Sequence, residues 1–363
     1  MFNNKKILIT GGTGYFGKEF TKYIYSMYRP KSLIIFSRDE AKQYEMQQDF
    51  PKKKYKGLKF FIGDVRDVSR LHMAFKEVDY VIHAAALKHV PSAEYNPIEC
   101  IRTNINGAEN IIKASIENNV EKVIALSTDK AANPINIYGA TKLASDKLFI
   151  AGNNLVGKNK TRFSIVRYGN VFASRGSVVP YFKKLISQKS KFIPITDKAM
   201  TRFVISIEQA INFVFKSFAR MSGGEIFVPK APSIKIVDLA KAMAPKLKLK
   251  FVGIRPGEKL HEILCPKDDA RNIYDFKDHY VITPSIKFFN KNNNYSKNKL
   301  KQKGKKVPID FEYNSEKNKI YLNIRQIKKL LEKSYRWLLE EPELQIQNFC
   351  IIVEMHHQQE KWC

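Results

Sequence analysis

The chain has 363 residues, of which 44% are hydrophobic and 27% charged, a composition that indicates a globular protein and excludes a disordered, collagen-like or coiled-coil chain. Its four cysteines are too scattered for a disulfide framework or a zinc site, so we expect no metal and a reducing compartment, the cytoplasm. The net charge of +28 suits a phosphate-bearing ligand, and because it is spread along the chain we expect no nucleic-acid partner.

The first residues lead directly into a strand of five residues, which is too short for the apolar region of a signal peptide. No window approaches the run of about 20 apolar residues that a membrane span requires. We therefore expect no export signal and no membrane partner.

Short β-branched runs alternate with helical stretches through the first half of the chain, a pattern typical of βαβ units with a parallel sheet. Amphipathic stretches such as Ile98–Asn118 are expected to cover both faces of that sheet. The predicted fold class is α/β, a Rossmann-type doubly wound parallel sheet. The predicted strands are Lys6–Thr10, Ser32–Phe36, Lys59–Ile62, Tyr80–His83, Lys122–Leu126 and Ser164–Val166.

After about Arg167 the alternation gives way to mixed segments punctuated by Gly and Pro. We predict a dinucleotide-binding domain over residues 1–166 and a smaller C-terminal substrate-binding lobe over 167–335, partly interleaved with it. The Asn- and Lys-rich stretch Phe289–Lys306 is expected to be a mobile surface loop. Residues 336–363 form a tail without an assigned role, and its His356-His357 pair lacks partner ligands for a metal.

A glycine-rich turn follows the first strand and opens a helix, in the sequence Thr10-Gly-Gly-Thr-Gly-Tyr-Phe-Gly17. Such glycines allow a tight turn, close approach of backbone N–H groups to a pyrophosphate and close helix packing. The context of strand, turn and helix makes this a dinucleotide site. The residues predicted to contact the dinucleotide here are Gly11, Thr13, Gly14, Tyr15, Phe16 and Gly17.

The end of the second strand indicates which dinucleotide binds. An NAD site usually places an acidic residue there, whereas this strand ends Phe36-Ser37-Arg38-Asp39. Arg38, with Ser37 and Lys42, can hold a 2′-phosphate, so NADP is the predicted cofactor, while Asp39 keeps NAD open. The predicted cofactor site is completed by Asp64, Val65, Ala84, Ala85, Ala86 and Val171.

Candidate catalytic residues follow the fifth strand. It leads into Ser127-Thr128-Asp129-Lys130, and Tyr138 and Lys142 come next, one helical turn apart on one face. The ammonium group of Lys142 is expected to lower the pKa of the Tyr138 phenol. Such a pair is specific because it follows strand five of a dinucleotide fold.

These residues resemble the extended short-chain dehydrogenases that act on nucleotide sugars. Within that family, residues 127–142 look like the inverting UDP-N-acetylglucosamine 4,6-dehydratases that begin pseudaminic acid synthesis for flagellin glycosylation. The resemblance covers about residues 5–330, stops beyond about Leu331, and implies a homo-oligomer. Other segments that match are Ser37–Glu40, His83–Val90, Arg167–Asn170, Gly224–Lys230 and Arg255–Glu262.

The chemistry that the resemblance implies begins at Tyr138, a phenolate held by Lys142 and helped by Thr128. It removes the proton from the sugar's 4-hydroxyl while hydride moves to the nicotinamide. The 4-ketone acidifies the hydrogen on carbon five, and we assign Lys130 as its base and Asp129 as the acid for the departing 6-hydroxyl. Lys130 can act as a base only if its pKa falls well below about 10, which Lys142, the oxidised nicotinamide and desolvation should favour.

The resemblance also implies a set of substrate contacts. Arg202 and Arg255 suit a diphosphate because the guanidinium fork binds two oxygens, although ordinary salt bridges would also explain them. The implied substrate contacts are Lys88, Asn170, Val178, Val179, Pro180, Tyr181, Phe182, Arg202, Arg255 and Glu258.

Four alternatives stay open: a 4-epimerase, a retaining 4,6-dehydratase, a reductase with external hydride turnover, and a non-catalytic NADP-binding regulator. The pair Asp129-Lys130 argues against the first two. Simple epimerisation needs no acid and base at carbons six and five, and the retaining dehydratases that this chain resembles carry an Asp-Glu pair. A regulator would not need the complete catalytic set.

Overall fold

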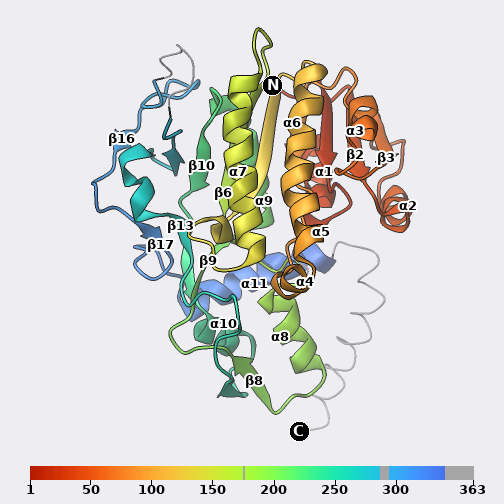
Figure 1. Ribbon diagram of the computed structural model, residues 1–363. Helices are drawn as coiled ribbons and strands as arrows, with labels where there is room; N and C mark the ends of the chain where they lie inside the picture. Colours follow the sequence, from red (N-terminus) through yellow and green to blue (C-terminus); the bar gives the residue numbers. More distant parts are fainter. Residues whose placement is uncertain (175, 287–293, 340–363) are drawn as a thin grey trace.

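The computed structural model describes residues 1–174, 176–286 and 294–339, with side chains up to residue 334. A ten-stranded sheet runs through it in the order β16-β14-β15-β10-β6-β5-β4-β1-β2-β3 (Figure 1). The strands from β3 to β10 pair in parallel, and β15, β14 and β16 add to the edge beyond β10 in antiparallel fashion. Its strands are β1 (Lys6–Thr10), β2 (Ser32–Ser37), β3 (Leu58–Ile62), β4 (Tyr80–His83), β5 (Lys122–Thr128), β6 (Arg162–Tyr168), β10 (Ile226–Pro229), β14 (Ile273–Asp275), β15 (His279–Ile282) and β16 (Lys305–Lys306).

The predicted α/β fold with a doubly wound parallel sheet is confirmed. Strands β1 and β4 have the bounds that the sequence predicted, and the other four run longer at one or both ends. Every residue of β2 is buried, because helices cover both faces of a parallel sheet and leave no polar face for alternation to reveal.

Alternate residues of the central strands point into two separate cores. In β1, Leu8 packs on the side of α3 (Val68–Ala74), α6 (Gly107–Glu117) and α7 (Ile137–Leu155). Ile7 and Ile9 pack on the opposite side, against α1 (Tyr15–Met27) and α9 (Ile207–Arg220). The side chains of the central strands thus alternate between two cores, as expected for a sheet covered by helices on both faces.

The predicted helix over Ile98–Asn118 is interrupted. It consists of α5 (Pro97–Ile101), a π-helical turn over Arg102–Asn106, and α6. Shorter elements before it are α2 (Glu40–Asp49) and α4 (Val90–Tyr95). Within the π-helical turn Asn104 accepts a hydrogen bond from Leu87 N at 2.9 Å and donates to Leu87 O at 3.0 Å, which ties the segment after β4 to this helix.

A smaller lobe lies below the sheet in Figure 1 and has an apolar core of its own. Chain after residue 166 enters both parts, since β10 and α9 belong to the large sheet layer, so the division at residue 166 stays a proposal. The elements of the lobe and its margin are β7 (Asn170–Val171), α8 (Val178–Ser187), β8 (Phe192–Ile195), β9 (Thr201–Ile205), β11 (Ser233–Lys235), α10 (Ile236–Met243), β12 (Lys248–Phe251), β13 (Ile263–Cys265), a 3-10 turn (Lys267–Asn272), β17 (Tyr313–Asn314) and α11 (Ile324–Leu339).

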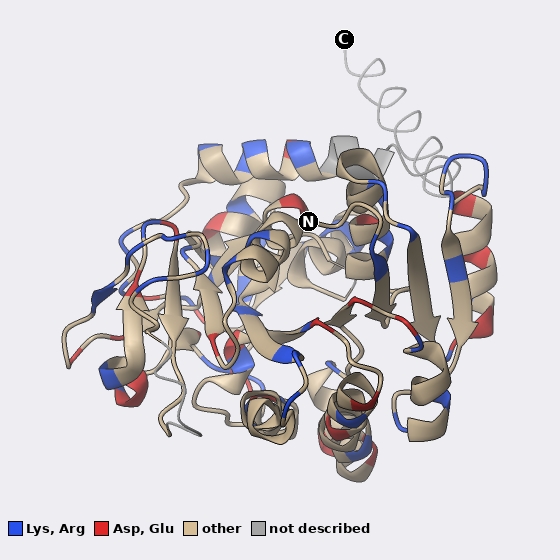
Figure 2. Ribbon diagram, turned by 90° about the horizontal axis from the view of Figure 1, so that it is seen from above, with Lys and Arg blue, Asp and Glu red and all other residues tan. Residues whose placement is uncertain are grey.

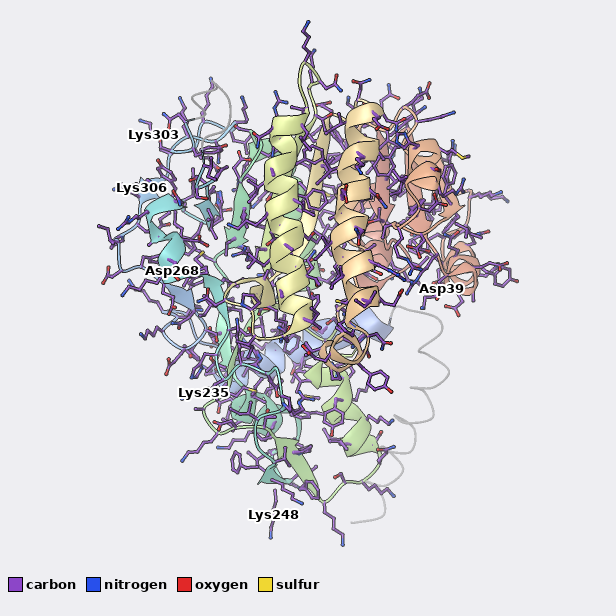
Figure 3. The ribbon with its side chains drawn as sticks, viewed as in Figure 1. Asp39, Lys235, Lys248, Asp268, Lys303 and Lys306 are labelled. Carbon is purple, nitrogen blue, oxygen red and sulfur yellow. The ribbon has the colours of Figure 1, made fainter. Side chains whose placement is uncertain are left out.

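In the view of Figure 2, Lys and Arg occur on elements throughout the described part of the chain. The described part of the predicted loop Phe289–Lys306 is not only loop: Lys297 and Lys303 form a bridge, and Lys305–Lys306 pair with β14. A cation–π contact stabilises this pairing, since the Lys306 ammonium lies 4.4 Å from the centre of the Tyr274 ring. In Figure 3, Lys303 and Lys306 lie on the opposite side of the molecule from Asp39 at the start of α2.

Among the described helices, none is both long and apolar enough to cross a membrane. The pair His356-His357 and most of the predicted tail, residues 340–363, lie outside the described residues.

Candidate active site

The glycine-rich turn lies between β1 and α1, at the carboxyl end of the sheet where β1 has neighbours on both sides. Gly11 has a φ of +65°, and a Cβ there would lie 2.9 Å from Ala85 Cα. A Cβ on Gly17 would overlap the Gly12 carbonyl oxygen. Gly14 is the N-cap of α1 and supplies no side-chain cap, and the N-terminus of a helix favours a negatively charged group. This cradle fits a dinucleotide phosphate.

At the end of β2, Asp39 and Arg38 have different partners. The Asp39 carboxylate caps α2, accepting from Lys42 N at 3.0 Å and from Lys42 Nζ at 2.6 Å. Lys42, predicted to bind a 2′-phosphate, is therefore paired with Asp39. The side chain of Arg38 is 56% exposed and has one loose ion pair, at 3.6 Å, with Asp64. Ser37 accepts a hydrogen bond from Gln43 at 3.2 Å.

The end of β4 is held by two polar residues that sequence reasoning missed. Thr10 Oγ1 accepts from the main-chain N–H groups of Ala84 and Ala85, each at 3.2 Å, and lies 2.9 Å from His83 Nδ1. Burial, with a smaller effect of Lys142, lowers the pKa of His83 to about 3. We assign a neutral imidazole that accepts the Thr10 proton, an arrangement that fixes Ala84 and Ala85 beside the glycine turn.

The catalytic candidates after β5 come together because α7 packs very closely on the 3-10 turn Asp129–Ala131. A Cβ on Gly139 would overlap the Lys130 carbonyl oxygen, so only glycine permits this approach. Thr128 Oγ1 donates to Asp129 Oδ1 at 2.9 Å and also interacts with the Tyr138 hydroxyl. Lys130 Nζ donates to Asp129 Oδ1 at 2.9 Å.

The pKa of Tyr138 differs from the expectation. Burial raises it to about 12, and the effects that lower it come from Lys130 and the Thr128 hydroxyl. Lys142 instead donates to the Leu126 carbonyl at 2.8 Å, and burial lowers the pKa of its own ammonium group. In the structure the desolvation of the phenol outweighs the charges beside it, and the activation of Tyr138 by Lys142 stays a prediction.

The pKa of Lys130 also moves opposite to the expectation. Burial alone would lower it, but the charges of Asp129 and Glu262 outweigh burial and raise the pKa of Lys130 above its ordinary value. Glu262 Oε1 lies 3.1 Å from Lys130 Nζ. Sequence reasoning missed Glu262 as a site residue, although it ends the segment Arg255–Glu262. Its only signal was that segment match, since it lies 132 positions away from Lys130.

Arg202 is not free to bind a diphosphate in this structure. Its guanidinium donates to the Thr201, Leu260 and Lys259 carbonyls at 2.7, 3.0 and 2.9 Å and pairs with Glu258 and Glu262. By contrast, the side chain of Arg255 is 72% exposed and forms a two-point ion pair with Glu258, at 2.9 and 3.1 Å. Arg255 therefore fits the alternative of an ordinary surface salt bridge, and the contact of either arginine with a diphosphate stays a prediction.

The remaining substrate candidates divide by burial. Val179 and Phe182, on the first turns of α8, belong to the core of the smaller lobe, whereas Tyr181 is exposed and Val178 and Pro180 are half-buried. Lys88 is exposed beyond β4, and Asn170 and the cofactor candidate Val171 form the short strand β7. Val65 is buried under Gly107.

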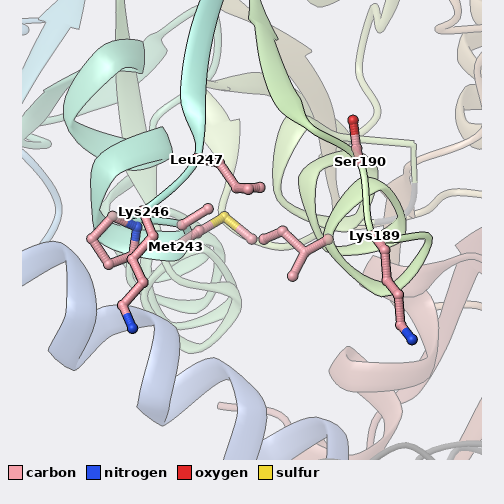
Figure 4. Close-up of a pocket in the computed structure, with 8 residues that line it drawn as sticks. Lys189, Ser190, Met243, Lys246 and Leu247 are labelled. Atoms are coloured by element: carbon pink, nitrogen blue, oxygen red, sulfur yellow. The ribbon is translucent and has the colours of Figure 1, made fainter.

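An apolar pocket of about 400 Å³ lies elsewhere, in the smaller lobe (Figure 4). Its lining comes from the end of α8 and the segment after α10 and includes none of the predicted site residues. The described residues also contain no group of three or more His, Cys, Asp or Glu side chains that could hold a metal.

A parallel Rossmann-type sheet with a glycine cradle, and a Thr128-Asp129-Lys130-Tyr138 cluster at the same strand ends, define an extended short-chain dehydrogenase/reductase. The chain belongs to the family described as "Polysaccharide biosynthesis protein", which matches residues 7–284.

Among its relatives, a Campylobacter jejuni protein named UDP-N-acetylglucosamine 4,6-dehydratase (inverting) is 57% identical over 91% of this chain and 98% of its own length. A Rickettsia canadensis protein named UDP-glucose 4-epimerase is 42% identical over 91% of this chain and 96% of its own. The solved structure of Pen from Bacillus thuringiensis is 34% identical, with a TM-score of 0.81, and covers 92% of this chain and 99% of that one.

Proposed function

We propose that this protein is a UDP-N-acetylglucosamine 4,6-dehydratase that inverts carbon five, a hydro-lyase with NADP as its cofactor. The observation that carries the proposal is the contact between Asp129 and Lys130, an acid and a base 2.9 Å apart beside the Tyr138 hydroxyl. Identity of 57% to a protein of that name supports the same reaction. We further propose a cytoplasmic homo-oligomer that serves pseudaminic acid synthesis and flagellin glycosylation.

In the proposed reaction Tyr138 takes the proton of the 4-hydroxyl. Hydride acceptance from carbon four, and its later return to carbon six, are the chemistry that the bound nicotinamide supplies. Lys130 then removes the proton on carbon five while Asp129 protonates the 6-hydroxyl, which leaves as water. Lys130 is charged in the structure, so it must first pass a proton on, and Asp129 is the adjoining acceptor, with a pKa raised by burial and then by Glu262.

The cofactor proposal has support from Arg38 and Asp39. An acidic side chain at the end of β2 would favour the ribose hydroxyls of NAD, but the Asp39 carboxylate is occupied by Lys42 and the cap of α2. Arg38 is the exposed cation at that position and can donate to a 2′-phosphate. The glycine cradle, with Ala85 against Gly11, would hold the pyrophosphate.

Replacing Arg38 by Ala is expected to weaken NADP binding about 10- to 100-fold and to leave NAD binding unchanged, because one charge-assisted contact to the phosphate is lost. Titration of the purified protein with each dinucleotide measures both affinities. Arg66→Ala is the matched control, since Arg66 is already paired with Asp64 at 2.8 Å and with Glu99 at 2.6 Å. Equal loss of NAD and NADP affinity in Arg38→Ala would contradict the assignment.

A 4-epimerase is the second candidate, because relatives with that name are 42% identical over most of the chain. An epimerase and a dehydratase share the first oxidation at carbon four and differ in the later steps. Only the dehydratase needs the acid and base that Asp129 and Lys130 provide.

The test is NMR of the purified protein with UDP-N-acetylglucosamine in deuterated water. We expect a 4-keto-6-deoxy product that carries deuterium and inverted configuration at carbon five. Retained configuration would reassign the protein to the retaining dehydratases, and a 4-epimer or unchanged substrate would contradict the roles of Asp129 and Lys130.

A further inference from the structure

Glu262 is a buried carboxylate that has no assigned part in the proposed dehydration. Its main chain is fixed on both sides by Ser315, whose Oγ accepts from Glu262 N at 2.9 Å and whose N–H donates to Glu262 O at 2.8 Å. The side chain is 3% exposed, and its Oε1 lies 3.1 Å from Lys130 Nζ and 3.7 Å from Arg202 Nε. Its Oε2 has no hydrogen-bond partner among the described residues. The strand pairing of the smaller lobe therefore holds this carboxylate against Lys130.

Lys130 consequently lies between two carboxylates, Asp129 and Glu262, whose pKa values shift in opposite directions. Burial raises the pKa of Asp129, and the negative charge of Glu262 raises it further. Burial also acts on Glu262, but the cations Lys130, Arg202 and Lys259 outweigh it and hold its pKa below the ordinary value. Glu262 therefore stays ionised, and the proton that moves is shared between Asp129 and Lys130.

We propose that Glu262 is a positioning residue, which fixes the Lys130 side chain beside Asp129 and keeps the shared proton on the Asp129–Lys130 pair. This inference rests on the proposed dehydratase function. The negative charge of Glu262 raises the pKa of both Asp129 and Lys130, so it opposes loss of the proton that they share, and a fixed hydrogen-bond acceptor holds Lys130 Nζ within hydrogen-bond distance of Asp129 Oδ1. Movement of that proton from Lys130 to Asp129 produces the two forms that the elimination needs, a carboxylic acid and a free amine.

The protons balance through the elimination. The Lys130 amine takes the proton of carbon five and becomes an ammonium group, the electron pair left on carbon five forms a double bond to carbon six as the carbon–oxygen bond at carbon six breaks, and Asp129 gives its proton to the departing hydroxyl. The product side of this step is a carboxylate at Asp129 and an ammonium at Lys130. That is the ionisation in which the structure pairs Lys130 with both Asp129 and Glu262.

Replacing Glu262 by Gln keeps its shape and removes its charge. We expect kcat to fall about 100-fold, since small misplacement of a reacting group has effects of that order, while KM for UDP-N-acetylglucosamine stays unchanged. A nearby negative charge raises the pKa of both protonation steps of the Asp129–Lys130 pair. Loss of that charge should therefore move the alkaline limb of the kcat–pH profile to lower pH by about one to three units. The charged groups that face Glu262 are Asp129, Lys130, Arg202 and Lys259.

Two further variants complete the experiment. Glu262→Asp keeps the charge but withdraws it by one methylene, and should be intermediate in both kcat and the alkaline limb. Glu316→Gln is the matched control, since this carboxylate is 55% exposed, pairs only loosely with His261 at 3.6 Å, and should leave kcat and the pH profile as in wild type.

Each outcome decides something. A low kcat with an unmoved alkaline limb in Glu262→Gln would reveal a purely structural role and overturn the inference, as would a wild-type kcat. If thermal unfolding shows that Glu262→Gln does not fold, a wild-type kcat and alkaline limb in Glu262→Asp overturns it instead. Failure of wild type to dehydrate the substrate would refute the proposed function, which separates the two failures.

Discussion

Replacing Tyr138 by Phe is expected to lower kcat by about 100- to 10,000-fold, because the phenol is the only group proposed to take the 4-hydroxyl proton. Its pKa of about 12 in the structure means that the phenol is protonated at neutral pH, with Lys130 and Thr128 as the side chains that favour the phenolate. Activity of wild type should therefore rise with pH up to the alkaline limb of the profile, as the fraction of phenolate increases. The Phe variant, which has no proton to lose, should lack this rise.

The measurement is the steady-state rate of product formation across pH for both proteins. Tyr168→Phe is the matched control, since Tyr168 is also a buried tyrosine whose pKa is raised by burial, and it should change kcat only slightly. A Tyr138→Phe variant with wild-type kcat would contradict the role of Tyr138 as the first base.

Replacing Asp129 by Asn should stop the reaction after the first oxidation. The amide keeps the shape that accepts the hydrogen bonds of Thr128 and Lys130 on Oδ1, but it cannot protonate the 6-hydroxyl. We expect a loss of about 100- to 10,000-fold in product formation, while oxidation at carbon four continues because Tyr138 is unchanged. Rapid mixing with UDP-N-acetylglucosamine should then show reduced nicotinamide accumulating by its absorbance.

The control for this variant is Asp268→Asn. Asp268, which is labelled in Figure 3, is an exposed carboxylate, so its variant should behave as wild type. If Asp129→Asn forms the dehydrated product at the wild-type rate, another group must be the acid. If it fails to reduce the cofactor at all, Asp129 is needed for the first step and not for the loss of water.

Local patterns were sufficient to predict the dinucleotide half of the molecule. Glycines at 11 and 17 are required by close backbone contacts, across one strand pair for Gly11 and within a few positions for Gly17, and β1 and β4 were predicted to the residue. The interruption of the helix at Arg102–Asn106 was not predicted, because it accompanies the contact of Asn104 with Leu87, a tertiary interaction that hydrophobic periodicity does not record.

The pKa values of Tyr138 and Lys130 lie above their ordinary values in the structure, opposite to the direction expected from the sequence, for a related reason. A spacing of four residues on a helix places Tyr138 and Lys142 on one face, but it does not say that Lys142 bonds to Leu126 or how deeply the phenol is buried. Similarly, the resemblance implied that Arg202 contacts a diphosphate, whereas in the structure Arg202 donates to the carbonyls of Thr201, Lys259 and Leu260.

The sequence by itself determined the class of fold, the glycine cradle and which side chains follow β5, because these depend on residues that are close along the chain. Only the tertiary structure decided the electrostatics of the site. Glu262 reaches Lys130 from 132 residues away, and the sum of burial and opposite charges, rather than the identity of either residue, sets which of them holds the proton.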